Sequence, residues 1–154
     1  EGKRLMQIWV DADACPVVVK EILFKAAERL KVSLTLVANQ HIRVPASQVI
    51  RSVQVPSGFD VADNWIAEQV QLKDLVITAD VPLAAAVVAK GAYALNPRGE
   101  FYTPETIANR LTLRNLMTEL RDTGQIQSYT AGYSAKDKQN FANQLDRFLQ
   151  KHTK

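Results

Sequence analysis

Short apolar runs alternate along the chain with longer stretches in which apolar residues recur at steps of three or four. A short apolar run that stops at Asp, Pro or Gly is typical of a buried strand, and the longer period is typical of an amphipathic helix. The runs predict strands at residues 5–10, 32–39, 49–55, 74–80 and 92–96. The periodic stretches predict helices at residues 16–31, 60–71, 81–91 and about 103–121, and a last helix after Ser134.

Residues at the ends of these segments support the predicted boundaries. Asp13 is a candidate N-cap for the first helix, which carries Pro16 in its first turn. Gly91 is suited to end a helix, because glycine adopts the left-handed conformation found there. Thr103 and Ser134 are suited to cap the helices that follow them.

Strands that alternate with helices predict a parallel sheet with right-handed crossovers and helices on both faces. We therefore expect an α/β fold, a three-layer Rossmann-like sandwich with a central, mostly parallel sheet in residues 5–100. Two further C-terminal helices are expected to pack on it. The first strand is expected in the centre of the sheet, with the fourth strand beside it.

Length and composition indicate one domain without a membrane segment. A chain of 154 residues, 47% of them hydrophobic, can bury the core of one domain. The apolar run from Val81 to Ala89 is far short of the roughly 20 residues that span a bilayer. We expect Met6 to be the natural start, with residues 1–5 an added segment. A single cysteine excludes an internal disulfide and fits a reducing cytoplasm.

The net charge of +3 is modest and unevenly distributed. Residues 1–102 hold 11 Lys/Arg and 11 Asp/Glu, whereas residues 103–154 hold 8 and 5. This excess fits a weak attraction to polyanions. The candidates for a surface that binds a nucleic-acid backbone are Arg110, Arg114, Arg121, Lys136 and Lys138. The same residues are equally typical of the solvated side of a helix.

Acidic residues follow two of the predicted strands. Asp11 and Asp13 come after the first strand and Asp80 after the fourth, while Asp60 and Asp63 begin the helix before the fourth strand. Because sites in open parallel sheets form at the carboxyl ends of the strands, we expect these residues at one edge. Like charges gathered there repel each other, and a divalent cation removes the repulsion. Mg²⁺ and Mn²⁺ prefer oxygen ligands and support phosphodiester hydrolysis.

Helix capping is a second explanation for the same acids. An aspartate at a helix N-terminus is stabilised by capping and by the helix dipole, without any further role. This explanation is strongest for Asp60 and weakest for Asp11, Asp63 and Asp80 taken together.

Five stretches of the chain carry a family resemblance. They are VDADACPV (10–17), SGFDVADNWI (57–66), DLVITADVPLAAAVVAKGA (74–92), NPRGE (96–100) and KDKQNFANQLDRFL (136–149). Over essentially its whole length the chain thereby resembles the YaiI/YqxD family of small bacterial proteins. That family resembles the PIN-like fold, whose better-known members are metal-dependent ribonucleases or structure-specific nucleases. The resemblance implies a single PIN-like domain over residues 6–154.

The PIN-type pattern places one Asp after the first strand, one acid on a middle helix and one Asp after the fourth strand. The resemblance implies that Asp11, Asp63 and Asp80 are catalytic and bind Mg²⁺ or Mn²⁺. It makes Asp13 an extra ligand or a base for water. PIN nucleases usually have a further acid after the last motif, and here Glu100 is the nearest candidate.

Polar residues near the same edge are candidates for substrate binding. They are Asn39, Ser57, Thr78 and Arg98, with His41 and Arg43 as further loop residues. Thr78 matches the Thr that often precedes the last acid of the PIN-type pattern. An Arg after the fifth strand could bind phosphate. Cys15 and Trp65 are instead expected to be structural, because Trp65 follows helical core spacing and no His lies near Cys15 in the sequence.

We favour a divalent-metal-dependent nuclease that acts on RNA. A non-catalytic PIN-like module that binds nucleic acid or a protein is the main alternative, since the fourth acid is missing. A haloacid-dehalogenase-like phosphatase is less favoured, because Cys15 replaces the Thr or Val of its D-x-D-x-[TV] signature. The C-terminal helix is a candidate homodimer interface by analogy with PIN-like folds.

Overall fold

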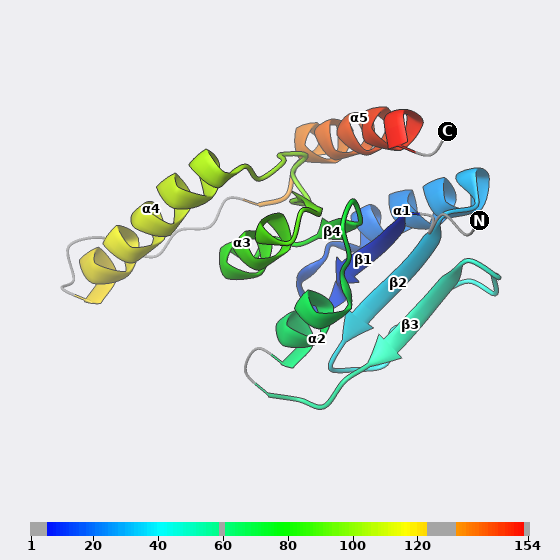
Figure 1. Cartoon of the computed structure of the whole chain (residues 1–154), viewed down its shortest axis with the longest axis horizontal. Helices are drawn as coiled ribbons and strands as arrows, with labels where there is room; N and C mark the ends of the chain where they lie inside the picture. Colours follow the sequence, from blue (N-terminus) through cyan, green and yellow to red (C-terminus); the bar gives the residue numbers. More distant parts are fainter. Residues whose placement is uncertain (1–5, 59–60, 123–131, 153–154) are drawn as a thin grey trace.

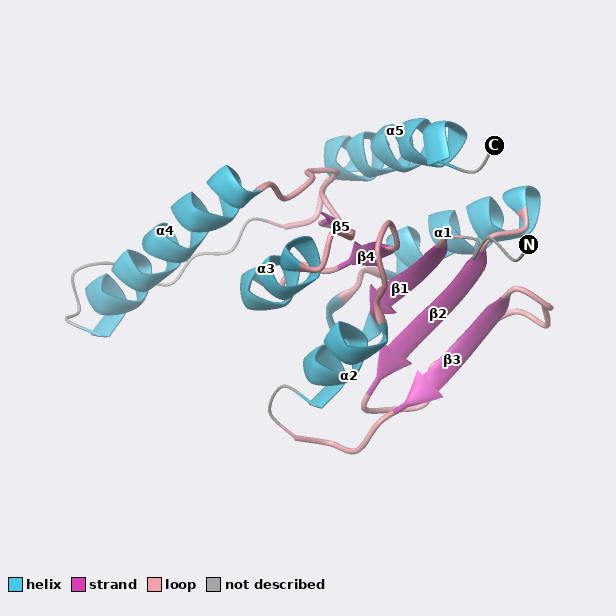
Figure 2. Ribbon diagram, viewed as in Figure 1, coloured by secondary structure: helices cyan, strands magenta, loops and turns pink. Residues whose placement is uncertain are grey.

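The computed structural model describes residues 6–58, 61–122 and 132–152 and contains a five-stranded parallel sheet (Figures 1 and 2). Its strands are β1 (Gln7–Asp11), β2 (Ser33–Ala38), β3 (Ile50–Gln54), β4 (Leu75–Ile77) and β5 (Tyr93–Leu95), in the order β3-β2-β1-β4-β5. β1 lies in the centre, paired with β2 and β4. The predicted parallel sheet and the predicted pairing of the first and fourth strands are confirmed.

Helices connect and flank these strands. They are α1 (Val17–Leu30), α2 (Val61–Gln69), α3 (Val81–Ala89), α4 (Pro104–Asp122) and α5 (Ala135–His152). One turn of 3-10 helix, η1 (Ala12–Ala14), joins β1 to α1. Each predicted helix forms within a few residues of its predicted bounds. In the described ranges, no helix is both long and apolar enough to cross a membrane.

Alternate side chains of each strand enter two hydrophobic cores, one on each face of the sheet. In β1, Ile8 and Val10 belong to the core that α1 and α5 cover, whereas Trp9 belongs to the core that α2 and α3 cover. Phe141 of α5 and Ile66 of α2 are fully buried in these two cores. The result is the predicted three-layer α/β sandwich, with α4 extending away from the sheet (Figure 1).

The predicted caps are confirmed at two helices and wrong at one. Thr103 Oγ1 accepts a hydrogen bond from the amide of Thr106 at 3.2 Å. Ser134 and Asp137 cap each other's amides at 3.1 and 3.0 Å, as in a capping box. Asp13 does not cap α1, because η1 intervenes and Pro16 takes the N-cap position without a side-chain hydrogen bond.

A buried carboxylate stabilises the amino edge of the sheet. Asp74 is fully buried and accepts hydrogen bonds from the amides of Gln7 and Gln71 at 3.1 and 3.0 Å. It also accepts one from the indole of Trp9 at 3.0 Å. Since a buried carboxylate needs several donors, this arrangement satisfies Asp74 and fastens β1 to the segment that precedes β4.

Candidate functional site

One threonine hydroxyl connects the carboxyl ends of β1 and β4. Ile77, the last residue of β4, is in register with Val10, so Thr78 follows beside Asp11. Thr78 Oγ1 donates a hydrogen bond to Asp11 Oδ2 at 3.1 Å and accepts one from the amide of Asp80 at 3.0 Å. Thr78 is only 2% exposed, so this buried side chain fixes the two acidic positions relative to each other.

The environment of Asp11 disfavours its negative charge. Burial raises the pKa of the Asp11 carboxyl above its ordinary value, although the hydrogen bond from Thr78 opposes the rise. The negative charges of Asp80 and Asp13 raise this pKa further. These three acids are therefore close enough to interact through their charges, and a proton or a cation would relieve the repulsion between them.

The turn η1 presents Asp13 at the same edge. Asp13 Oδ2 accepts a hydrogen bond from the backbone amide of Asn39 at 2.9 Å. β1 and β2 pair up to Asp11 and Val37, so Asn39 directly follows β2 at the carboxyl edge. The side chains of Asp13 and Asn39 are exposed. Both residues thus lie at the predicted edge, while their roles in catalysis and substrate binding stay predictions.

Asp63 enters from a different element, the first turn of α2. A crossover helix runs back across the sheet, so α2 begins on the side where β3 ends. Within the described ranges, no three His, Cys, Asp or Glu side chains are placed to hold one metal ion. Asp11, Asp13 and Asp80 are close enough for their charges to interact, and Asp63 as a metal ligand stays a prediction. Asp60 lies outside the described residues.

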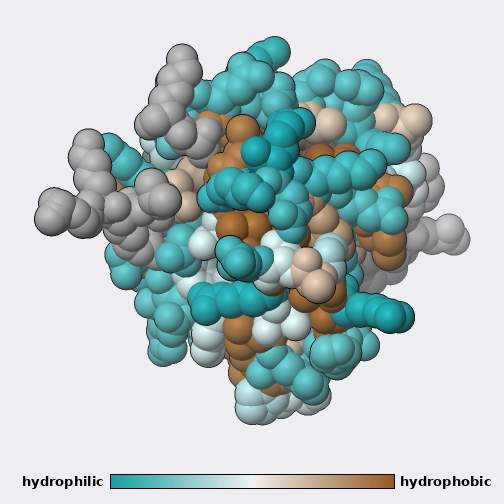
Figure 3. Space-filling model, turned by 90° about the vertical axis from the view of Figure 1, so that its right-hand side faces the viewer, coloured by the Kyte–Doolittle hydropathy of each residue, from teal (hydrophilic) through white to brown (hydrophobic). Residues whose placement is uncertain are grey.

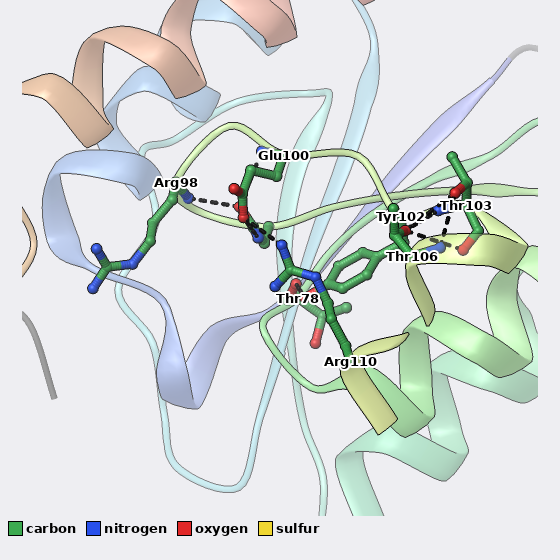
Figure 4. A network of polar contacts seen from close by, with 8 residues as sticks. Thr78, Arg98, Glu100, Tyr102, Thr103, Thr106 and Arg110 are labelled. Carbon is green, nitrogen blue, oxygen red and sulfur yellow. Dashed lines mark hydrogen bonds and ion pairs between the residues drawn. The ribbon is translucent and has the colours of Figure 1, made fainter. Parts of the chain in front are cut away.

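A polar network after β5 contains the candidate fourth acid (Figure 4). Glu100 Oε1 accepts hydrogen bonds from Arg110 Nη2 at 2.7 Å and from Asn96 Nδ2 at 2.9 Å. The hydrogen bond from Asn96, followed by that from Arg110, holds the pKa of Glu100 below its ordinary value. Glu100 is therefore ionised and engaged by a cation of α4, which distinguishes it from Asp11.

Tyr102 lies between this network and the acidic edge. Its hydroxyl makes a long hydrogen bond of 3.4 Å to the carbonyl of Thr78, and the Arg110 guanidinium lies 5.4 Å from its ring centroid (Figure 4). Burial raises the pKa of Tyr102, and the negative charges of Glu100 and Asp80 add to the rise. Tyr102 thus remains a neutral hydrogen-bond donor near Asp80 at physiological pH.

Sequence reasoning did not select Asn96 or Tyr102 for this edge. Asn96 directly follows β5, so the argument that placed Asp80 after β4 could have found it. Tyr102 has no comparable signal, because it reaches Thr78 through the turn that returns the chain along β5, where Phe101 bridges to Leu95.

Arg98 does not turn toward this network. Its guanidinium forms an ion pair with Asp137 of α5 at 2.9 Å and points away from Glu100 (Figure 4). The backbone amide of Arg98 donates to Asn96 Oδ1 at 2.9 Å, which helps to form the turn after β5. The ion pair with α5 gives Arg98 a structural role, and its role in phosphate binding stays a prediction.

Cys15 and Trp65, which were expected to be structural, both pack in or against the hydrophobic cores. Cys15 is buried in the core that α1 covers, and burial raises the pKa of its thiol to about 12, which disfavours the nucleophilic thiolate. Trp65 packs in an edge-to-face arrangement against Trp9, with ring centroids 5.8 Å apart, and lies against the core.

The other candidate residues lie in exposed segments. Ser57 is exposed in the turn after β3, and His41 and Arg43 are exposed between β2 and β3. Of the predicted basic surface, Lys136 and Lys138 are exposed on the first turns of α5. The side chains of Arg114 and Arg121 lie outside the described part of the chain.

Comparisons with known proteins give a consistent family assignment. A family model described as "Uncharacterized BCR, YaiI/YqxD family" (DUF188) matches residues 9–151. A UPF0178 protein of Herminiimonas arsenicoxydans is 60% identical over 94% of this chain and 97% of its own length. UPF0178 proteins of Hahella chejuensis and Halorhodospira halophila are 59% and 62% identical, over 97% and 94% of this chain and 99% and 95% of their own lengths. No solved structure matches the chain.

Proposed function

The chain belongs to the YaiI/YqxD family, and we propose that it is a divalent-metal-dependent nuclease that hydrolyses phosphodiester bonds, with RNA as the favoured substrate. The observation that carries the proposal is the hydrogen-bonded connection from Asp11 through Thr78 to Asp80. It lies where β1 and β4 meet, at the edge at which open parallel sheets form their sites.

The chemistry of the donors fits Mg²⁺ or Mn²⁺. Asp11, Asp13 and Asp80 offer only carboxylate oxygens, which are the ligands that these cations prefer. Mg²⁺ commonly uses one or two carboxylates and completes its shell with water and substrate oxygens. Asp11 and Asp80 would supply that pair, whereas Asp63, the third ligand predicted from the sequence, is not placed with them to hold one ion in the described part of the chain. When bound, the cation would polarise a phosphoryl oxygen and lower the pKa of a water molecule.

The protein's own groups would orient the substrate and move the proton. The hydrogen bond from Asn39 holds the Asp13 carboxylate beside Asp11, where Asp13 can accept a proton from the attacking water. Tyr102 is buried and donates its one hydroxyl proton to the carbonyl of Thr78, so it would support the position of Thr78 and not contact the substrate itself. The net charge of +3 favours a polyanionic substrate.

Calorimetric titration of Mn²⁺ tests the cation site. We expect the wild type to bind in the micromolar to low-millimolar range, and Asp11→Asn and Asp80→Asn to abolish binding. Glu68→Gln is the matched control, since it removes one exposed negative charge near the C-terminal end of α2, the end of that helix far from the acidic edge. No binding by the wild type, or equal binding by both Asn variants, would contradict the proposal.

Cleavage of a labelled single-stranded RNA, with and without Mn²⁺, tests the reaction. We expect Mn²⁺-dependent cleavage that chelation stops and Asp11→Asn removes. RNA binding without cleavage, unchanged by chelation, would instead support a non-catalytic binding module.

A further inference from the structure

A second concave site lies between β5 and α5, and its lining includes Tyr102, which also contacts Thr78 at the acidic edge. It has a volume of about 580 Å³, within the range typical of small-molecule sites. The C-terminal end of α3 and the start of α4 also line it, and its lining includes none of the acids Asp11, Asp13 and Asp80. Its outer end reaches Lys151 and His152, at the C-terminal end of α5.

Aromatic rings form one wall of this site. Tyr93 lies 5.0 Å from Phe148 and 5.1 Å from His152, measured between ring centroids. Phe148 and His152 stack at 4.2 Å, and Phe101 lies 5.6 Å from Phe148. Tyr93 is 37% exposed although it stands in a strand, so part of this cluster is accessible to a ligand. Stacked rings of this kind bind planar aromatic groups.

The charged groups that line the site are cationic. Arg147 and Lys151 are exposed, lie one helical turn apart on α5 and both line the site. None of the twelve described residues that line it is Asp or Glu. Burial lowers the pKa of His152, and the positive charges of Lys151 and Lys73 lower it further. Positive charge therefore lies close to this ring. The site therefore favours an anion next to a planar ring.

The helix dipole explains part of the positive charge at the end of α5. Figure 3 views the side of the molecule on which the end of α5 and the start of β1 lie, and hydrophilic and hydrophobic residues are interspersed on it. Basic residues in the last turn of a helix complement the helix dipole even without a ligand. That effect explains Lys151 and His152, but it does not explain Tyr93, a partly exposed ring of the sheet that contacts His152.

We propose that this site binds a nucleotide, with its base against Tyr93 and His152 and its phosphate held by Arg147 and Lys151. The volume accommodates a base with its ribose and phosphate. The chemistry is that of a free mononucleotide or of one nucleotide unit in a single strand. The proposal does not depend on metal at the acidic edge, and it can be tested with that edge inactive.

Binding is measured in EDTA, by calorimetry with AMP and UMP and by fluorescence anisotropy with a labelled single-stranded RNA of twelve nucleotides. We expect the wild type to bind and Arg147→Gln/Lys151→Gln to bind at least about tenfold more weakly. Tyr93→Leu keeps an apolar packing group but removes the ring, and we expect about a tenfold loss. Lys20→Ala/Lys25→Ala removes the same charge from α1 and should bind as the wild type does.

The outcomes distinguish a free nucleotide from a nucleotide in a strand, and the site beside α5 from the acidic edge. Equal affinity per site for AMP and for the RNA identifies a free nucleotide, whereas binding of the RNA alone identifies a strand. Circular dichroism shows whether each variant is folded. The proposal is overturned if the folded wild type binds neither probe, or if Arg147→Gln/Lys151→Gln binds both unchanged. Because EDTA removes any metal, this result is independent of the Mn²⁺ titration.

Discussion

At the scale of single residues, Asp11 opposes folding in the absence of a cation. Its pKa is raised in the folded state by burial and by the charges of Asp80 and Asp13. Between the ordinary and the raised pKa, the folded protein keeps a proton that the unfolded chain releases. The free energy of unfolding therefore falls as pH rises through that window, and the stability present at lower pH is lost above it.

Asp11→Asn should accordingly stabilise the metal-free protein at neutral pH. An amide oxygen can still accept the hydrogen bond from Thr78, while the repulsion is gone. We expect the free energy of unfolding to rise by up to about 1 kcal/mol, which corresponds to a rise in Tm of about 2–4 °C. Thermal melts in EDTA from pH 4 to 8 measure it, and the difference from the wild type should grow with pH and then level off. A lower Tm for the variant at pH 7 would contradict this account.

Thr78→Val should weaken both the fold and the cation site. Valine has nearly the shape of threonine but leaves the amide of Asp80 and the carboxylate of Asp11 without their shared partner. We expect a loss of about 1–3 kcal/mol, because both groups are partly buried. Cation affinity should fall about tenfold or more, as is typical when the partner of a ligand is removed.

Urea unfolding and Mn²⁺ titration measure these two effects, and Thr78→Ser is the control that keeps the hydroxyl. If serine restored neither stability nor cation binding, the hydroxyl would not be the connecting group.

At the scale of elements, Gly99 determines how closely α5 approaches the turn after β5. Its φ of +90° lies in the left-handed region, and a Cβ there would come within 2.6 Å of the backbone carbon of Asn140. Backbone of a packed helix cannot yield as a side chain can. Glycine at this position therefore permits the close contact that also brings Arg98 to Asp137.

Gly99→Ala should displace α5 and destabilise the protein by about 2–4 kcal/mol, from backbone strain together with the steric clash. Urea unfolding measures the loss. Gly132→Ala is the control, because a Cβ there meets no atom within 4 Å. Equal stability of the two variants would show that α5 does not pack against this turn.

The sequence predicted elements better than it predicted their contacts. Apolar periodicity located the helices because burial of one face is a local pattern that each helix repeats. Asp13 was misassigned as a cap because Ala12–Ala14 form a separate 3-10 turn, which no periodicity marks. The placement of Asp11 and Asp80 at one edge followed from topology, since Asp11 ends β1 and Asp80 comes shortly after β4, which pairs with β1.

Contacts distant in sequence could not be predicted in the same way. The ion pairs Arg98–Asp137 and Arg110–Glu100 join residues 39 and 10 positions apart. Each connects the turn after β5 to a helix, α5 or α4, whose packing no local pattern specifies. The aromatic site likewise joins β5 to the last turn of α5. Such pairings depend on how whole elements pack.

At the scale of the whole molecule, α5 completes the core of one face. Leu145 is 1% exposed and belongs to the same core as Ile8 and Val10 of the central strand. Leu145→Ala should cost about 2–5 kcal/mol by leaving a cavity. Leu113→Ala, at a residue that is 56% exposed on α4, should change stability by no more than about 0.5 kcal/mol.

Urea unfolding followed by circular dichroism and by tryptophan fluorescence measures both variants. Coincident transitions are expected, because the core under α5 and the tryptophans on the other face share β1. Separate transitions would mean that α5 unfolds by itself.

The buried thiol of Cys15 has a practical consequence for labelling. Burial raises the pKa of the thiol to about 12, which disfavours the reactive thiolate at pH 7, and the residue is only 9% exposed. It is the one cysteine in the sequence. A cysteine introduced at an open position such as Leu113 would therefore react with a maleimide dye or spin label far faster than Cys15. Distances between probes could then be measured in the otherwise native chain, without first replacing a core residue.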